Sequence, residues 1–307
     1  MQLSIATVGL GIANVALALG LAPLFEGIVR KVTARIQSRQ GPPLLQPYFD
    51  LFKLLGKEDI ESGQSPVMQR FAAYLSLATV LTVAGLVPMG GQAPLGTGSD
   101  VILLIYLLTL SGIATLLAGL AAGSTYSLVG VSREMMAMLT LEPLLAVAIV
   151  IGAVHTGTLR LDPVLNGSVY HAGSFPIAGL MMFLIILFAL QAFVGRMPFD
   201  TSEAETEIME GPVMEYSGPK LALFKYARMV KLFVYCSLFV ALFIPWGQTG
   251  LYLPDVLILL VKVSVLVLLV TLVAATHARY RIDQVIRYYA GLFGLALVAL
   301  VLAVSGW

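Results

Sequence analysis

The sequence predicts an all-α membrane protein, a single transmembrane domain over residues 1–307 with about eight membrane-spanning helices. Of the 307 residues, 59% are hydrophobic and 11% are charged, and the mean hydropathy is +0.93. A soluble domain has about 25% charged residues. The chain also contains a series of apolar runs, each close to the roughly 20 residues that a helix needs to cross the hydrocarbon core. These observations together favour a polytopic membrane protein.

Eight segments have the length and composition of membrane spans. They lie at roughly 3–28, 69–89, 100–121, 133–155, 175–195, 221–245, 255–276 and 285–306. The first lacks the basic region and the small-residue cleavage site of a signal peptide, and it is too long for one. We therefore expect it to stay in the chain as a membrane anchor.

The distribution of basic residues predicts the direction of these spans. Loops on one face (30–68, 122–132, 196–220 and 277–284), together with the adjacent span ends, carry most of the Lys and Arg residues. Loops on the other face (90–99, 156–174 and 246–254) contribute only Arg160. Since loops rich in Lys and Arg stay in the cytoplasm, the sequence predicts a multi-pass protein of the cytoplasmic (inner) membrane with both termini outside.

The first cytoplasmic loop is expected to contain two helical parts. Residues 26–39 prolong the first span, with Glu26 and Arg30 at the favourable i, i+4 spacing, and residues 41–43 (Gly-Pro-Pro) break it. A second helix opens at Pro47 and carries an apolar and a polar face, which is typical of an interfacial amphipathic helix. The apolar face holds Leu51, Leu54 and Leu55, and the polar face holds Asp50, Lys53 and Lys57. This helix either only anchors the chain at the membrane surface or also forms one wall of a substrate pocket, and the sequence leaves both interpretations open.

An acidic island, residues 196–218, separates the fifth and sixth spans. It holds six of the seventeen acidic residues of the chain: Asp200, Glu203, Glu205, Glu207, Glu210 and Glu215. We expect a short helix, capped by Thr201 or Ser202 and ended by Gly211 and Pro212, with one acidic stripe along it. Asp200, Glu203, Glu207 and Glu210 have the helical spacing for that stripe. A solvated loop helix is the plain alternative, but the position between two membrane spans favours a functional role.

Three ionisable residues within predicted spans are candidates for a functional role: Glu134, Glu142 and Lys262. The fourth span is expected to begin at Ser132, which places Glu134 near the membrane interface and Glu142 about two turns deeper. Pro143 leaves the carbonyl of Leu139 without its helical donor. A charge at membrane depth costs about 2.5–3.5 kcal/mol on insertion scales, so Glu142 should be protonated, paired or in contact with water. Lys262, in the seventh span, is the comparable basic residue.

Several classes of function are excluded. The net charge of +1 and the absence of a basic tract with interleaved aromatics speak against nucleic-acid binding. The only cysteine, Cys236, excludes a disulfide and an iron–sulfur cluster ligated by this chain alone. The three histidines have no metal-ligand spacing, so we expect no metal and no haem.

Three stretches carry a resemblance to a known family. They are RKVTARIQSRQGPPLLQPYFDLFKLLGKE, SREMMAMLTLEP and MPFDTSEAETEIMEGPVMEYSG. In their order and spacing they resemble the membrane subunit that links the peripheral redox arm to the antiporter-like arm of respiratory complex I (the subunit 1/H type). Two departures exist: Gly41-Pro42 leads at once to residues 44–47, without the insertion of the quinone-reducing enzymes, and the island reads EGPVMEYSG. The pattern is closest to the membrane subunit of energy-converting nickel–iron hydrogenases and formate hydrogenlyases.

This resemblance implies a linking subunit of a redox-driven ion pump that holds no cofactor of its own. It implies a nickel–iron centre and iron–sulfur clusters in partners: a hydrogenase-like large subunit, an iron–sulfur subunit and antiporter-like membrane subunits. For ion coupling the candidates are Glu26, Glu134, Glu142, Asp200, Glu203, Glu205, Glu207, Glu210 and Glu215, with Lys262 added for its depth. For docking they are Arg30, Arg35, Arg39, Asp50 and Lys53, with Lys31 added for its charge.

Two other functions compete with this reading. A quinone-site subunit of a complex I-type NADH dehydrogenase is the nearest alternative. A self-contained secondary transporter is a rival from another class, but such folds usually have repeated halves and matched broken helices, and the sequence has neither.

Overall fold

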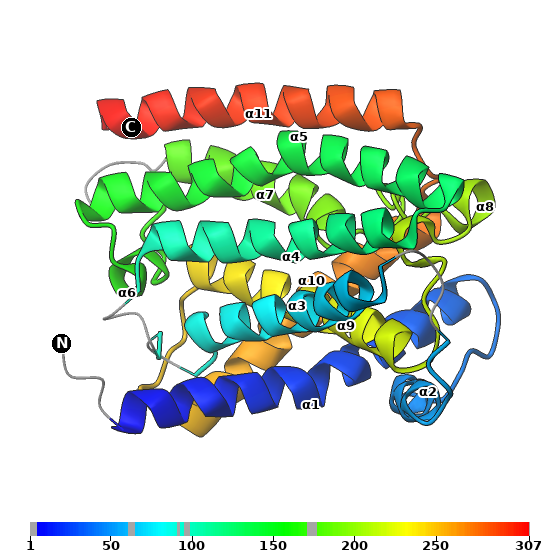
Figure 1. Cartoon of the computed structure of the whole chain (residues 1–307). Coiled ribbons are helices and arrows are strands. Elements are labelled where there is room, and N and C mark those ends of the chain that lie inside the picture. The colour runs from blue at the N-terminus through cyan, green and yellow to red at the C-terminus, as the bar shows by residue number, and fades with distance from the viewer. Residues whose placement is uncertain (1–4, 61–64, 91–92, 95–98, 171–176, 307) are drawn as a thin grey trace.

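Eight long helices in the described part of the chain run side by side and alternate in direction (Figure 1). The computed structural model describes residues 5–60, 65–90, 93–94, 99–170 and 177–306. The long helices are α1 (Ile5–Ile36), α3 (Pro66–Leu86), α4 (Val101–Ala122), α5 (Thr125–Thr156), α7 (Ile177–Phe193), α9 (Gly218–Phe243), α10 (Tyr252–Thr276) and α11 (Ile282–Ser305). The end at which α1 begins is also the end at which α11 finishes. The all-α polytopic fold is confirmed.

Seven of these helices, within the residues that the structure describes, are long and apolar enough to cross a membrane. The eighth, α7, is apolar but has 17 residues, at the lower limit for a spanning helix. It begins directly after residues 171–176, which lie outside the described part, as do the first residues of the spans predicted at 3–28 and 175–195.

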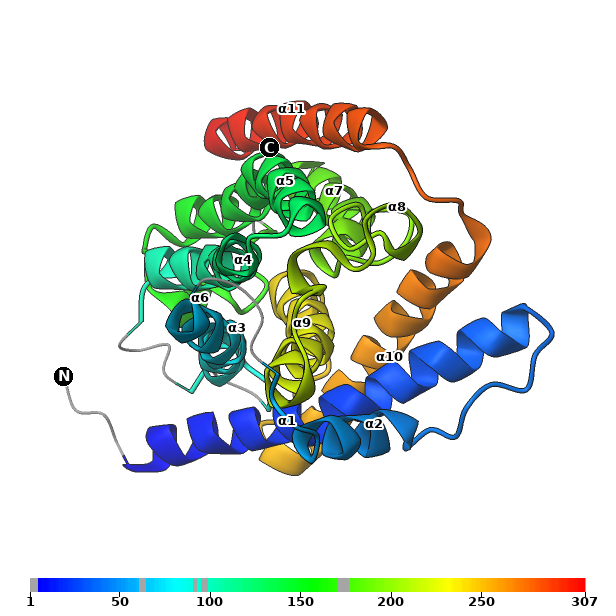
Figure 2. The ribbon, with the colours of Figure 1, turned by 45° about the vertical axis from the view of Figure 1, so that its right-hand side comes forward.

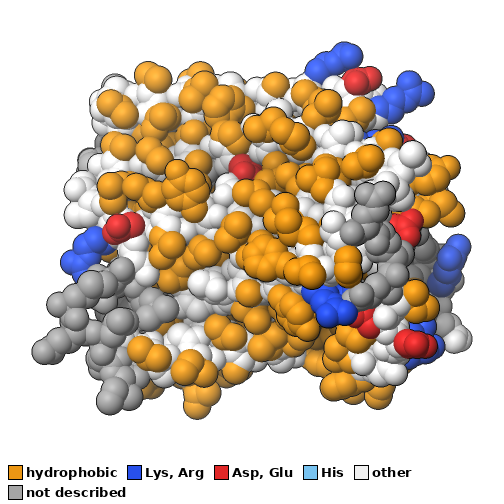
Figure 3. Space-filling model, viewed as in Figure 1, with side chains coloured by type: hydrophobic (Ala, Val, Ile, Leu, Met, Phe, Trp, Pro, Cys, Tyr) orange, Lys and Arg blue, Asp and Glu red, His pale blue; other side chains and the backbone are white. Residues whose placement is uncertain are grey.

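Four short elements lie at the two ends of the bundle. Helix α2 (Gln46–Leu55), helix α8 (Glu205–Ile208) and the 3-10 helix η1 (Gly211–Val213) are at one end, and α6 (Leu161–Val164) is at the other (Figure 1). We call the first end, formed by residues 26–60, 123–133, 195–218 and 277–287, the charged end. Apolar side chains cover most of the face between the two ends, and one small acidic patch interrupts them near the middle (Figure 3).

Helix α2 lies across the ends of α1 and α9 and is seen nearly end-on in Figure 1. Leu51 is buried and Leu54 is half-buried, as the amphipathic pattern predicts. Leu55 was expected on the same apolar face, but it is exposed, as are Phe49 and Phe52. The helix is therefore apolar on its inner and outer sides, and its polar residues form a strip along one edge.

Helix α9 is the most deeply buried of the long helices and runs through the middle of the bundle (Figure 2). From Leu232 to Phe243 every side chain is buried. Phe233 packs against Phe25 of α1, and Phe239 against Phe183 of α7, each with ring centroids 5.4 Å apart. A helix that is apolar all round is stable either among other helices or in lipid. Because the side chains of α9 are buried by its neighbours, α9 forms the core.

Helix α5 begins about two turns earlier than the sequence suggested. Gly123 ends α4 with a left-handed conformation (φ +70°), and the Ser124 side chain accepts a 3.2 Å hydrogen bond from the Ser127 amide. This tight turn lets α5 start at Thr125. The start expected at Ser132 is therefore wrong: its hydroxyl lies inside the helix and donates to the Val129 carbonyl.

Candidate functional site

A cavity of about 840 Å³ enters the bundle from the charged end. It lies between α1, α4, α5, α9 and the acidic island, and it reaches Leu141 and Tyr235 well inside the helices. Eight of the candidate coupling and docking residues line it: Glu26, Arg30, Arg39, Glu134, Glu142, Asp200, Glu203 and Glu210. The structure thus gathers carboxylates from α1, α5 and the island around one space.

The wall on α1 is an ion-pair chain. Glu26, which is 6% exposed, pairs with Arg196 of the island and with Arg30 at 3.4 Å. Arg30 also pairs with Asp50 of α2 at 2.8 Å. A buried carboxylate needs such partners, since removing one partner of a buried pair costs about 3–5 kcal/mol. The chain therefore connects the island, α1 and α2.

Asp50 is the outermost member of that chain. Partial burial acts to raise the pKa of Asp50, but hydrogen bonds from Gln46 (2.9 Å) and Arg30 outweigh it. The pKa of Asp50 therefore lies below its ordinary value, because both donors stabilise the charged form. Asp50 stays ionised as the contact between α2 and α1.

The acidic island does not form the predicted helix with one acidic stripe. Its α-helical part is Glu205–Ile208, whose N-cap residue is Ala204 instead of Thr201 or Ser202, and a 3-10 turn follows at Gly211–Val213. Three of the carboxylates instead form ion pairs with arginines on three other segments of the chain. Arg279 donates to both oxygens of Asp200 (2.9 and 2.6 Å), and Glu203 pairs with Arg228. Such charge-assisted pairs are stronger than the contacts of an isolated helix with repelling carboxylates.

Glu207 makes the third of these pairs, with Arg133 of α5, which also donates to the Thr201 carbonyl. Glu207 and Glu215 are not among the described residues that line the cavity. The side chain of Glu205 lies outside the described part of the structure.

A left-handed turn carries Glu210 to the cavity wall. Met209, Glu210 and Gly211 all have positive φ angles, of 51°, 70° and 53°. Two consecutive residues other than glycine in this region are strained, each by about 1–3 kcal/mol. The next residue, Pro212, sits so close to Gly130 of α5 that a Cβ there would lie 2.6 Å from its ring. Packing against α5 and α4 therefore holds the turn.

Glu134 and Glu142 lie on one face of α5 and line the deeper part of the cavity. Both are half-buried, and within the described structure neither has a hydrogen bond or an ion pair from its side chain. Glu134 was expected near the start of its helix, but α5 begins at Thr125, so it lies in the third turn. The two carboxyls thus differ from the paired carboxylates nearer the charged end.

Some cavity residues were missed as candidates from the sequence. Lys231 and Tyr235 of α9 and Tyr289 of α11 line the space beside Glu134 and Glu142. Lys231 had a recognisable signal, a basic residue within an apolar span, which is the reasoning applied to Lys262. The tyrosines had no signal, because aromatic residues are common in membrane helices.

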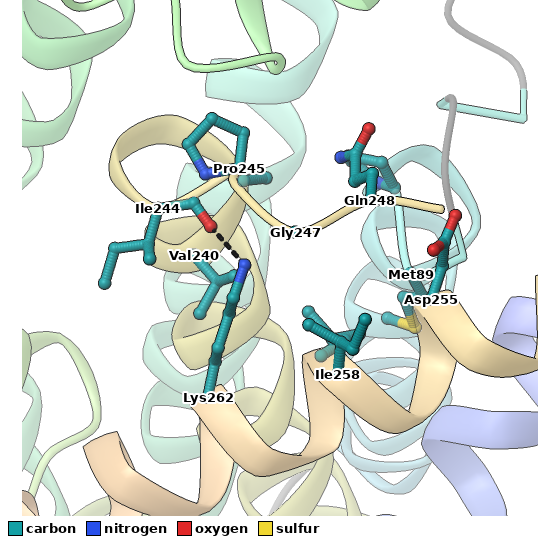
Figure 4. A pocket seen from close by; sticks show the side chains of 12 residues that line it. Met89, Val240, Ile244, Pro245, Gly247, Gln248, Asp255, Ile258 and Lys262 are labelled. Atoms are coloured by element: carbon teal, nitrogen blue, oxygen red, sulfur yellow. Dashed lines mark hydrogen bonds between the residues drawn. The ribbon is translucent and has the colours of Figure 1, made fainter. Parts of the chain in front are cut away.

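Lys262 lies apart from this cavity. Its ammonium donates to the carbonyl of Ile244 at 2.7 Å (Figure 4). It also donates to the carbonyl of Trp246, just beyond the end of α9. It lines a cavity of about 30 Å³ with Asp255, whose carboxylate accepts the Thr249 and Gly250 amides. Lys262 therefore donates hydrogen bonds to carbonyls that have no backbone partner because the helix has ended.

Two of the docking candidates, Arg30 and Arg39, line the large cavity, and the other four lie on α1 and α2 at the charged end. Arg35, Arg39 and Lys53 are exposed, and Lys31 is half-buried. Among the residues described, no group of three or more His, Cys, Asp or Glu side chains could hold a metal ion.

Comparison with known proteins assigns a family. A family model described as NADH dehydrogenase matches residues 9–304. The chain belongs to the NADH dehydrogenase subunit 1/H family. Formate hydrogenlyase subunit 4 of Escherichia coli is 34% identical to this family member over 291 residues, covering 92% of this chain and 94% of that one.

Two further comparisons span nearly the whole subunit. NADH-quinone oxidoreductase subunit 8 of Thermus thermophilus is 34% identical over 292 residues, covering 88% of this chain and 78% of that one. Among solved structures, a chain of the membrane-bound sulfane sulfur reductase, an archaeal respiratory membrane complex, superposes with a TM-score of 0.87. It is 27% identical, and the match covers 97% of this chain and 100% of that chain.

Proposed function

We propose that this chain is the membrane linking subunit of a redox-driven ion-pumping complex of the energy-converting hydrogenase or formate hydrogenlyase type. It anchors the peripheral arm at the charged end and couples electron transfer in that arm to the movement of protons or sodium ions. Its relatives support this type, because two of them are formate hydrogenlyase subunit 4 and hydrogenase-4 component C, each 34% identical.

One observation carries the coupling role: the cavity changes character with depth. Near the charged end three of its carboxylates, Glu26, Asp200 and Glu203, are paired with arginines. Deeper inside, Glu134 and Glu142 have no such partner among the described residues. An unpaired carboxyl at membrane depth changes its charge when a charge nearby changes, whereas a paired one stays ionised. The deep carboxyls are therefore suited to respond to a redox event transmitted through the paired ones.

The partners follow from the same proposal. A hydrogenase-like large subunit and an iron–sulfur subunit dock on the basic residues around the cavity mouth, and they hold the nickel–iron centre and the iron–sulfur clusters. Antiporter-like membrane subunits pack beside the bundle in the lipid bilayer. The charged end faces the cytoplasm, in the cytoplasmic membrane, with both termini outside.

Purification of the chain from its own membranes, with an affinity tag, tests the proposal. We expect it to co-purify with soluble subunits that contain nickel and iron, and to be inert once separated from them. Co-purification with a flavin-containing NADH dehydrogenase would move the assignment to the complex I type. A chain that transports a solute when reconstituted alone would refute both.

The size of the cavity favours one alternative. About 840 Å³ is within the range of small-molecule sites, and a quinone-site subunit needs such a space. If this alternative holds, quinone-site inhibitors will block turnover of the purified complex. In the hydrogenase-type complex they leave turnover unchanged.

A further inference from the structure

Lys231 stands outside the ion-pair network of the cavity. Three cations on α9, Lys225, Arg228 and Lys231, follow one another at three-residue intervals along the cavity wall. Arg228 pairs with Glu203 and donates to the Gly195 carbonyl at 3.1 Å. Within the described structure, the ammonium of Lys231 has no ion pair and no hydrogen bond. Its contact is with an aromatic ring, since it lies 5.7 Å from the ring centroid of Tyr235.

The two unpaired carboxyls lie on the opposite wall. Glu134 and Glu142 are two turns apart on α5 and face the same cavity. Lys231 and Tyr235 line that cavity from α9, and Tyr289 lines it from α11. These five side chains therefore face one shared space.

The numbers of positive and negative charges in this group are unequal. A lone charge is costly away from water, so an ammonium and a carboxylate in the same apolar space stabilise each other. One ammonium balances one carboxylate, and two ionised carboxylates near each other repel. Arg228 does not supply a second positive charge for Glu134 and Glu142, because it already forms an ion pair with Glu203.

We infer that Lys231 is the positioning residue of the Glu134–Glu142 pair: its single charge balances one ionised carboxylate, so the pair holds one exchangeable proton. The two carboxyls are eight residues, about 12 Å of helix, apart, so the proton passes between them through water in the cavity. It leaves one carboxyl oxygen for the first water, and the last water gives a proton to the other carboxylate, without net change. This inference rests on the proposed function, for which it names the residue that sets the charge of the deep carboxyls.

Infrared spectroscopy of the purified complex tests this charge state without electron transfer or an ion gradient. The absorption of protonated carboxyls is assigned to the pair by its change in the variants Glu134→Gln and Glu142→Gln. In Lys231→Met we expect the assigned band to grow about twofold at neutral pH, because neither carboxylate then has a balancing charge. Lys231→Arg should keep the native band, since it keeps the charge.

Lys225→Met is the matched control, with the same loss of charge on the same helix two turns nearer the charged end, and it should leave the band unchanged. An unchanged band in Lys231→Met, or equal growth in Lys225→Met, would overturn the inference. If Lys231→Met does not assemble, Lys231→Gln, which keeps a polar side chain, is measured against the same control. If the carboxyl absorption grows in Lys231→Met but ion transport stays native, the charge balance by Lys231 holds and the proposed coupling role fails. The two proposals can therefore fail separately.

Discussion

The Tyr226 hydroxyl on α9 donates a 2.7 Å hydrogen bond to the backbone carbonyl of Leu19 on α1. That carbonyl lies four residues before Pro23, which is inside α1 and has no amide hydrogen to offer it. In a membrane no water replaces the missing donor, so a side chain from the neighbouring helix satisfies the carbonyl. The missing backbone hydrogen bond at Pro23 of α1 is therefore replaced by a side chain that the position of α9 supplies.

Removing this hydroxyl should destabilise the subunit. We expect Tyr226→Phe to cost about 1–3 kcal/mol, because the half-buried Leu19 carbonyl then has no donor. Thermal unfolding of the purified complex measures the loss. In a Pro23→Ala background, the new backbone amide can donate to the Leu19 carbonyl, so Tyr226→Phe should have little effect there. An equal loss in both backgrounds would show that the hydrogen bond is not the cause.

The Asp200–Arg279 pair should couple the island to the segment after α10. We expect Asp200→Asn and Arg279→Gln each to lower thermal stability, and the double variant to lose less than the sum, with a coupling energy of about 0.5–3 kcal/mol. Arg279→Lys should not restore stability, since a lysine cannot replace both hydrogen bonds to Asp200. Additive losses would mean that the two residues act independently.

Neutralising Arg35 and Arg39 together should weaken attachment of the peripheral arm. Both are exposed at the charged end, where the proposed partners dock. The measurement is the amount of soluble subunits retained on the tagged chain, at low and at high salt. Neutralising Arg281 and Arg287, also exposed at the charged end, removes the same charge and should have less effect. Full retention and coupling in the Arg35/Arg39 variant would count against this docking surface.

The orientation in the membrane should appear in cysteine labelling of intact cells. We expect Thr158→Cys, exposed at the end opposite the charged end, to react with an impermeant reagent from outside. Ser38→Cys, exposed at the charged end, should react only after the membrane is opened. The native Cys236 is buried and should give little background. The reverse pattern would invert the proposed topology.

Glu142→Gln should separate coupling from assembly. Glutamine keeps the shape and hydrogen bonding of glutamate but cannot release a proton. We expect the variant complex to assemble, to retain part of its electron transfer, and to move far fewer ions per electron in vesicles. A glutamate with only a structural role would tolerate glutamine and be harmed by Glu142→Leu, so a native ion-to-electron ratio in Glu142→Gln would end this assignment.

Local features of the sequence were sufficient for the spans, their alternation and the helix of the first loop. Apolar length and the break at Gly41-Pro42 act within a few residues, so they can be read along the chain. The sequence also made Glu142 and the island candidates for a functional role, because they stand out against apolar flanks. The starts of helices were less predictable: Ser124 and Ser132 are both plausible caps, and the turn after α4 decided between them.

Only the tertiary structure decided which partners those carboxylates have. The acidic spacing at Asp200, Glu203 and Glu207 predicted a helical stripe, but arginines far away in sequence draw each carboxylate in its own direction. Strong charge-assisted pairs with distant residues outweigh weak local helix preferences. Lys231 and Lys262 look alike in sequence, each a single cation in an apolar span. Only the packing of α9 and α10 places one beside unpaired carboxyls and the other on the carbonyls that follow a helix end.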